Sequence, residues 1–263
     1  MSNAASYFVD RHVVEGRAGK VAFCEVGTGR SLTYGALAEA SGRAASALLA
    51  QGVAREERMA MLVLDQIEFP ILFWGAIKAG VIPVPLNTLL ATPVYDAILR
   101  DSRATMLVVS EALFDVVAPA LADNPYLRHV VVIGDAAEGT ITYGTLMAMA
   151  ERALDPFEAS DDETAFWLYS SGSTGQPKGV HHVHSAMRAT AETYGAEVLG
   201  IREDDVVFSA AKFFFAYGLG NSMSFPMSVG ATTVIFGGRP TPDGVVEIIE
   251  TESPTIFCGV PTL

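Results

Sequence analysis

From Met59 onward, short apolar runs alternate with segments in which apolar residues recur at helical spacing. The run 59–64 predicts a strand, and the run 68–79 predicts an apolar helix. The alternation continues to a strand-like run at 255–260. Strands that alternate with helices are typical of a mostly parallel sheet with helices on both faces. We therefore predict the α/β class, with ligands bound beyond the carboxyl ends of the strands.

The composition limits what the chain can bind. Its 263 residues, half of them hydrophobic, are enough for a large core, which excludes a disordered chain. The formal net charge of −13 argues against nucleic acid and anionic membranes, because both attract basic surfaces. Cys24 and Cys258 lie in apolar runs, where buried and reduced thiols are expected. We expect a cytoplasmic protein without nucleic-acid or membrane partners, and we leave a homodimer open as its state of assembly.

The segment 169–180, YSSGSTGQPKGV, is the strongest indication of a ligand site. An apolar strand-like run at 165–169 leads into it, and Lys178 is its only charged residue. Glycines let the main chain approach a ligand closely, and successive N–H groups form a concave site for anions. The lysine adds a mobile positive charge, so the segment predicts a phosphate-binding loop. Its hydroxyl donors are Ser170, Ser171, Ser173 and Thr174.

Other known motifs do not fit this region. A Walker A loop needs Gly-x-x-x-x-Gly-Lys-Ser/Thr, and a hydrolase elbow would need glycine in place of Ser171; neither pattern occurs. The acidic residues of 155–164 are consecutive, which is typical of a solvated loop. The three histidines after the loop have no cysteine or carboxylate near them in sequence, so we expect no metal site. These histidines are His181, His182 and His184.

A second unusual segment, 210–231, carries three adjacent phenylalanines, a tyrosine and several glycines. A core helix explains its later part. Because Ala216 and Gly218 leave volume beside the rings, its earlier part predicts a flat slot for an aromatic ligand. The predicted wall of the slot consists of Phe214, Ala216, Tyr217 and Gly218.

These segments carry a resemblance to a known family. YSSGSTGQPKGV resembles the phosphate loop of the acyl-adenylate-forming (AMP-binding) superfamily. The run FFAYGLGN, together with the N-terminal SYFVDRHV, resembles the benzoate-CoA ligase branch, and the likeness extends from Asn3 to Leu263. The resemblance implies a two-step reaction with ATP, Mg²⁺ and coenzyme A. The carboxylate of an aromatic acid attacks the α-phosphate of ATP to give an acyl-adenylate and pyrophosphate, and the thiol of coenzyme A then displaces AMP.

The resemblance also implies roles for individual residues. The loop would grip the β- and γ-phosphates of ATP and neutralise charge on the leaving pyrophosphate, with Lys178 and Thr174 as catalytic residues. The benzoate ring would lie in the slot, which positions its carboxylate. The implied phosphate ligands are Ser170, Ser171, Gly172, Ser173, Thr174, Gly175 and Lys178, and the implied ring contacts are Phe214, Ala216, Tyr217 and Gly218.

The architecture that the resemblance implies is two stacked, mostly parallel or mixed sheets with helices between and outside them. Residues 53–199 would form one subdomain ending in the phosphate loop, and residues 3–52 would pair with 200–263 as the second. The family's Tyr-Gly-x-Thr-Glu segment, its ribose-binding aspartate and its C-terminal domain are absent. We therefore expect the N-terminal portion of such an enzyme, not competent alone. A hydroxy- or aminobenzoate ligase, a non-catalytic fragment that binds anions or aryl acids, and a self-assembling unit stay open.

Overall fold

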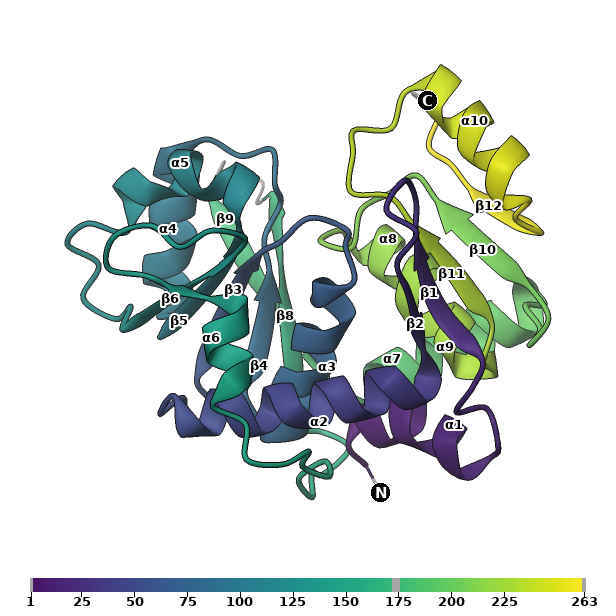
Figure 1. Cartoon of the computed structure of the whole chain (residues 1–263), viewed down its shortest axis with the longest axis horizontal. Coiled ribbons are helices and arrows are strands. Elements are labelled where there is room, and N and C mark those ends of the chain that lie inside the picture. The colour runs from purple at the N-terminus through teal and green to yellow at the C-terminus, as the bar shows by residue number, and fades with distance from the viewer. Residues whose placement is uncertain (1, 172–175, 262–263) are drawn as a thin grey trace.

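The computed structural model describes residues 2–171 and 176–261. Within these residues the strands form two five-stranded sheets and one two-stranded hairpin. Figure 1 shows the two sheets side by side, with helices α2 (Tyr34–Ala50) and α3 (Glu68–Ala79) running between and beneath them. The predicted α/β class, with two sheets and helices between and outside them, is confirmed.

The first sheet, sheet A, has the strand order β12-β10-β11-β1-β2. It takes strands from distant parts of the chain, because β1 pairs in parallel with β11 while β2 forms an antiparallel hairpin with β1. Gly27 and Gly29 in this hairpin turn have φ values of 78° and 69°, which glycine adopts without strain. The strands are β1 Val21–Glu25, β2 Ser31–Thr33, β10 Val206–Ser209, β11 Thr232–Ile235 and β12 Ile256–Cys258.

The second sheet, sheet B, has the order β4-β3-β5-β6-β7, and all its neighbouring strands are parallel. Its central strand β5 is buried along its whole length, because helices cover both faces of the sheet. The carboxyl ends of the parallel strands meet at one edge, where ligands of such sheets bind. The strands are β3 Arg58–Leu62, β4 Ile82–Pro85, β5 Met106–Ser110, β6 His129–Ile133 and β7 Ile141–Thr142.

The hairpin consists of β8 (Thr164–Ser171) and β9 (Pro177–Val183), which pair antiparallel. β8 also lies close to β4 of sheet B. The sequence predicted a loop that passes directly into a helix here, and for residues 177–183 that prediction is wrong. The glycine and proline of this stretch are typical of loops, but the stretch has a partner strand.

Packing of rings across the hairpin explains the additional strand. The imidazole of His181 stacks on the indole of Trp167, with ring centroids 4.0 Å apart. The imidazole of His182 stacks in the same way on Phe166 at 4.5 Å. Aromatic pairs between facing strands stabilise a sheet, and a local pattern along one strand does not reveal them.

The helix α3 lies between the two sheets, and all 12 of its residues are buried. It packs against α2, and a Cβ at Gly75 would lie 2.6 Å from the Cβ of Ala44 in α2, so glycine permits this close approach. Most of the core side chains belong to one cluster around these two helices. The other α-helices are α1 Arg11–Val14, α4 Thr92–Ser102, α5 Phe114–Val117, α6 Tyr143–Ala148, α7 His184–Thr190, α8 Ala216–Leu219, α9 Phe225–Val229 and α10 Pro242–Glu252. Short 3₁₀ turns occupy Glu111–Leu113 and Ala118–Ala120, and π-helical segments occupy Ser6–Asp10, Ala191–Val198 and Gly220–Ser224.

Candidate functional site

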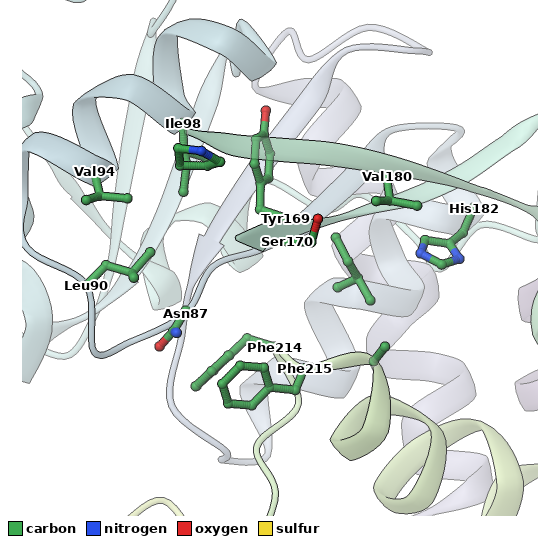
Figure 2. A pocket seen from close by; sticks show the side chains of 13 residues that line it. Asn87, Leu90, Val94, Ile98, Tyr169, Ser170, Val180, His182, Phe214 and Phe215 are labelled. Atoms are coloured by element: carbon green, nitrogen blue, oxygen red, sulfur yellow. The ribbon is translucent and has the colours of Figure 1, made fainter. Parts of the chain in front are cut away.

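A cavity of about 660 Å³ lies between the β8–β9 hairpin and the aromatic run that follows β10. Figure 2 shows Ser170, Val180 and His182 on the hairpin side and Phe214 and Phe215 across from them. The lining is mostly apolar with a few polar groups, as in sites for small organic ligands. The cavity therefore joins the two segments that the sequence singled out separately. The loop after β4 and helix α4 complete the wall with Asn87, Leu90, Val94 and Ile98.

The hairpin is anchored to helix α4. Tyr169 donates its Oη–H to Oδ2 of Asp101 in α4 at 2.5 Å. Burial and this carboxylate raise the pKa of Tyr169, so the phenol keeps its proton. Ser170 lies opposite Lys178 in the antiparallel register. Strand alternation puts Lys178, which is exposed, on the same face of β9 as the cavity-lining Val180.

The predicted phosphate loop is only partly described. Ser170 and Lys178 belong to strands β8 and β9, and Ser171 is the last residue of β8. Four of the predicted phosphate ligands lie outside the described residues, so their role stays a prediction. These are Gly172, Ser173, Thr174 and Gly175.

The aromatic run is held in the core by its first ring. Phe213 is fully buried, stacks on Phe69 of α3 with centroids 4.6 Å apart, and meets Phe23 of β1 edge-on at 6.3 Å. The next two rings line the cavity, with the centroids of Phe214 and Phe215 4.4 Å apart. The packing of Phe213 in the core therefore fixes the position of the main chain that carries Phe214 and Phe215.

The four predicted ring contacts fall into two pairs. Phe214 and Ala216 line the cavity, whereas Tyr217 and Gly218 do not contribute to the described part of its wall. The half-exposed Tyr217 donates from Oη to the first carbonyl after β12 at 3.3 Å. A Cβ on Gly218 would lie 2.0 Å from the carbonyl oxygen of Lys212. The expectation that Gly218 leaves empty volume beside the rings is thus wrong, because the main chain of Lys212 fills that volume.

A second cavity, of about 340 Å³, was missed by sequence reasoning and shares Phe214 and Phe215 with the first. Asp65, only 5% exposed, lines it and accepts the N–H of Phe213 at Oδ1 over 3.3 Å. Burial raises the pKa of Asp65 to about 6, against the opposing effect of the Lys212 charge. The sequence did contain one indication of this residue. Asp65 is a carboxylate just after the apolar strand β3, at the sheet edge where ligands bind.

The described ranges, 2–171 and 176–261, include all three histidines that follow the predicted loop. No group of three or more His, Cys, Asp or Glu side chains in these ranges is placed to hold a metal ion. His184 instead accepts the N–H of Ala4 at Nδ1 over 3.1 Å, and burial lowers its pKa and that of His182. No described helix is long and apolar enough to cross a bilayer.

The fold matches that of two solved CoA ligases. The crystal structure of a benzoate CoA ligase from Burkholderia xenovorans LB400 superimposes with a TM-score of 0.90 and 42% identity, over 99% of this chain and 50% of that chain. The anthranilate CoA ligase AuaEII in complex with anthranoyl-AMP gives a TM-score of 0.92 and 35% identity, over 97% and 49% of the two chains.

The sequence matches the AMP-binding enzyme family over residues 10–263, and the chain belongs to this family. A 4-hydroxybenzoate–CoA/benzoate–CoA ligase of Rhodopseudomonas palustris is 48% identical over 261 residues, which cover 99% of this chain and 48% of the relative. A benzoate–CoA ligase of Thauera aromatica is 47% identical over 262 residues, with 99% and 49% covered. The chain thus spans about half the length of the curated relatives it matches.

Proposed function

We propose that this chain is part of an AMP-forming aromatic acid–CoA ligase. The enzyme would use ATP and coenzyme A, with benzoate as the acid. One observation carries the proposal: a single cavity is lined by Ser170 from the predicted phosphate loop and by Phe214 and Ala216 from the predicted slot. The acid and the phosphates of ATP would then meet in one space, as a direct attack of carboxylate on phosphate requires. The relatives named for benzoate and 4-hydroxybenzoate support the choice of acid.

The hairpin supplies groups suited to the first half-reaction. When the carboxylate attacks the α-phosphate, negative charge grows on the departing pyrophosphate. Hydroxyl and N–H donors of the loop and the ammonium of Lys178 would stabilise this charge. We propose Lys178 and Thr174 as the catalytic residues and the loop from Ser170 to Lys178 as the phosphate grip.

The chain's own groups are a poor fit for a resident Mg²⁺ ion. Mg²⁺ prefers carboxylates together with phosphate oxygens and water. The described lining of the first cavity contains no carboxylate. We propose that Mg²⁺ arrives on the phosphates of ATP.

The aromatic run would bind the ring of the acid. Phe214 and Ala216 contact the cavity directly, whereas we propose that Tyr217 and Gly218 act behind this wall. Gly218 permits the close passage of the Lys212 main chain, which sets the position of the run. The aryl pocket proposed here therefore has two surface residues and two supporting ones.

The proposal extends to the subdomains, partners, location and assembly of the protein. We propose that residues 53–199 form one subdomain and that residues 3–52 and 200–263 form the other. The net charge of −13 supports a protein without nucleic-acid or anionic membrane partners. We also propose the cytoplasm as its location. A homodimer stays a prediction, which the mass of the protein in solution would test.

The test measures pyrophosphate release by the full-length protein with ATP, Mg²⁺ and one aromatic acid at a time. Benzoate, 3- and 4-hydroxybenzoate and 2-aminobenzoate are compared, and we expect the highest kcat/KM with benzoate. A clear preference for a hydroxy- or aminobenzoate would replace benzoate as the substrate. If no aromatic acid elicits release while calorimetry still detects benzoate binding to the 263-residue chain, the protein is a binding module and the proposal is wrong.

A further inference from the structure

Asp65 lies where the two sheets approach each other at their carboxyl ends. It follows β3 of sheet B, and its carbonyl oxygen is 3.4 Å from the position of a Cβ on Gly237, which follows β11 of sheet A. It lines the second cavity together with Lys212 and Arg239. A buried carboxylate at this junction touches the element that carries the proposed aryl wall.

The contact between Asp65 and the aromatic run is a long-range main-chain hydrogen bond. The N–H of Phe213 donates to Oδ1 of Asp65 at 3.3 Å, across 148 positions of sequence. Lys212 precedes this N–H, but its Nζ donates to the carbonyl of Phe236 and lies 5.1 Å from the centroid of that ring. Within the described residues no ion pair joins Asp65 to Lys212, so the carboxylate acts on the run through the main chain and at longer range on the lysine charge.

We propose that Asp65 is a positioning residue for the aromatic wall of the site. Its carboxylate, held at the end of β3, fixes the main chain at Phe213 and thereby the point from which Phe214 and Phe215 project into the cavity. The wall thus depends on a residue of the opposite sheet. The part of this inference that concerns substrate rests on the proposed function.

Stability alone does not explain a carboxylate at this position. Burial raises the pKa of Asp65 to about 6, so the protein makes the ionised carboxylate less favourable than it is in water. An asparagine would offer the same oxygen acceptor to the N–H of Phe213 without a buried charge. Lys212 and Arg239 are the basic residues that line the second cavity with Asp65. The negative charge of Asp65 is suited to attracting these two positive charges.

Hydrogen exchange on the 263-residue chain tests the proposal without reference to activity. We expect Asp65→Ala to speed exchange of the Phe213 amide by about tenfold or more, because the amide loses a buried charged acceptor. Asp65→Asn, which retains an acceptor, should have a smaller effect. Asp10→Asn is the control. Asp10 is a partly buried carboxylate that does not line this wall, and its Oδ1 lies 2.6 Å from Nζ of Lys78. We expect no change in the exchange of Phe213 in that variant.

Three results would overturn the proposal: unchanged exchange at Phe213 in Asp65→Ala, an equal increase across both sheets, or the same increase in Asp10→Asn. In the full-length protein, Asp65→Ala should raise KM for the aromatic acid by about tenfold, and Asp65→Asn by less, while KM for ATP changes little, as expected when only the acid is misplaced. Equal rises in both KM values would also count against the proposal. If the wild-type protein shows no activity with any aromatic acid, the proposed function fails, and the exchange result still decides the role of Asp65.

Discussion

Ser170 of β8 and Lys178 of β9 lie opposite each other across the hairpin, beside the cavity that Phe214 lines from the other side. A hydroxyl donor and an ammonium group thus face one another on adjacent strands. An anion bound at this end of the hairpin would meet both groups. The pairing links the two ends of the predicted phosphate loop, of which residues 172–175 lie outside the described residues.

Lys178→Ala should slow adenylation in the full-length protein by about 10- to 100-fold, because its charge is expected to offset charge on the leaving pyrophosphate. Benzoate-dependent exchange of pyrophosphate into ATP measures this step. Lys20→Ala is the control, since Nζ of Lys20 donates to the carbonyl of Glu203 and Lys20 is not among the described residues that line the cavity. Exchange at the wild-type rate in Lys178→Ala would remove the lysine from the mechanism.

The stack of His181 on Trp167 should contribute measurably to the hairpin. His181→Ala is expected to lower the free energy of unfolding by about 0.5–1 kcal/mol, the usual contribution of such a cross-strand pair. Urea unfolding followed by circular dichroism measures the difference. His181→Phe retains a ring and should recover most of the loss. A larger loss with phenylalanine than with alanine would show that the stack does not stabilise β9.

His12 should make the protein less stable in mild acid. Its imidazole is fully buried, donates from Nε2 to the carbonyl of Met227 at 2.6 Å, and accepts from Arg17 at Nδ1 over 3.2 Å. Burial above all lowers the pKa of His12 to about 4, below its ordinary value of 6.5. The unfolded chain therefore binds the proton more readily than the folded protein does. The neutral, buried imidazole contributes fully to the free energy of unfolding above pH 6.5, and this contribution is lost as the pH falls toward 4.

The expected loss from His12 is at most about 3 kcal/mol of unfolding free energy, which follows from the shift in pKa. Chemical unfolding of the wild type and of His12→Gln at a series of pH values between 4 and 8 measures it. The stability difference between the two proteins should shrink as the pH falls. A difference that stays constant over this range would contradict the assignment to His12.

Gly218→Ala should be strongly destabilising. A Cβ at this position would lie 2.0 Å from the carbonyl oxygen of Lys212, which is main chain and cannot rotate away. We expect a loss of about 2–4 kcal/mol, typical of severe overpacking in a buried site. Thermal unfolding measures the effect. Gly19→Ala serves as control, because no atom of the described residues lies within 4 Å of a Cβ there. Equal melting temperatures for the two variants would show that the run shifts without cost.

Elements with a clear local pattern were predicted closely. The helix at Glu68–Ala79 has the bounds that apolar periodicity indicated, and the strand-like run at 255–260 contains strand β12. The strand Pro177–Val183 was missed, because its stability comes from rings on β8 rather than from its own sequence. Asp65 was missed for a related reason, since its partner N–H lies 148 positions away.

The sequence by itself determined the α/β class and the family, because alternating apolar runs and two distinctive segments are local properties of the chain. Only the tertiary structure decided that Ser170 and Phe214 line one cavity, and that the Lys212 main chain, rather than a ligand, fills the space beside Gly218. Both outcomes depend on how two sheets and a hairpin pack around buried rings. Such packing places main-chain and side-chain atoms within a few tenths of an ångström, and patterns along the chain do not contain that information.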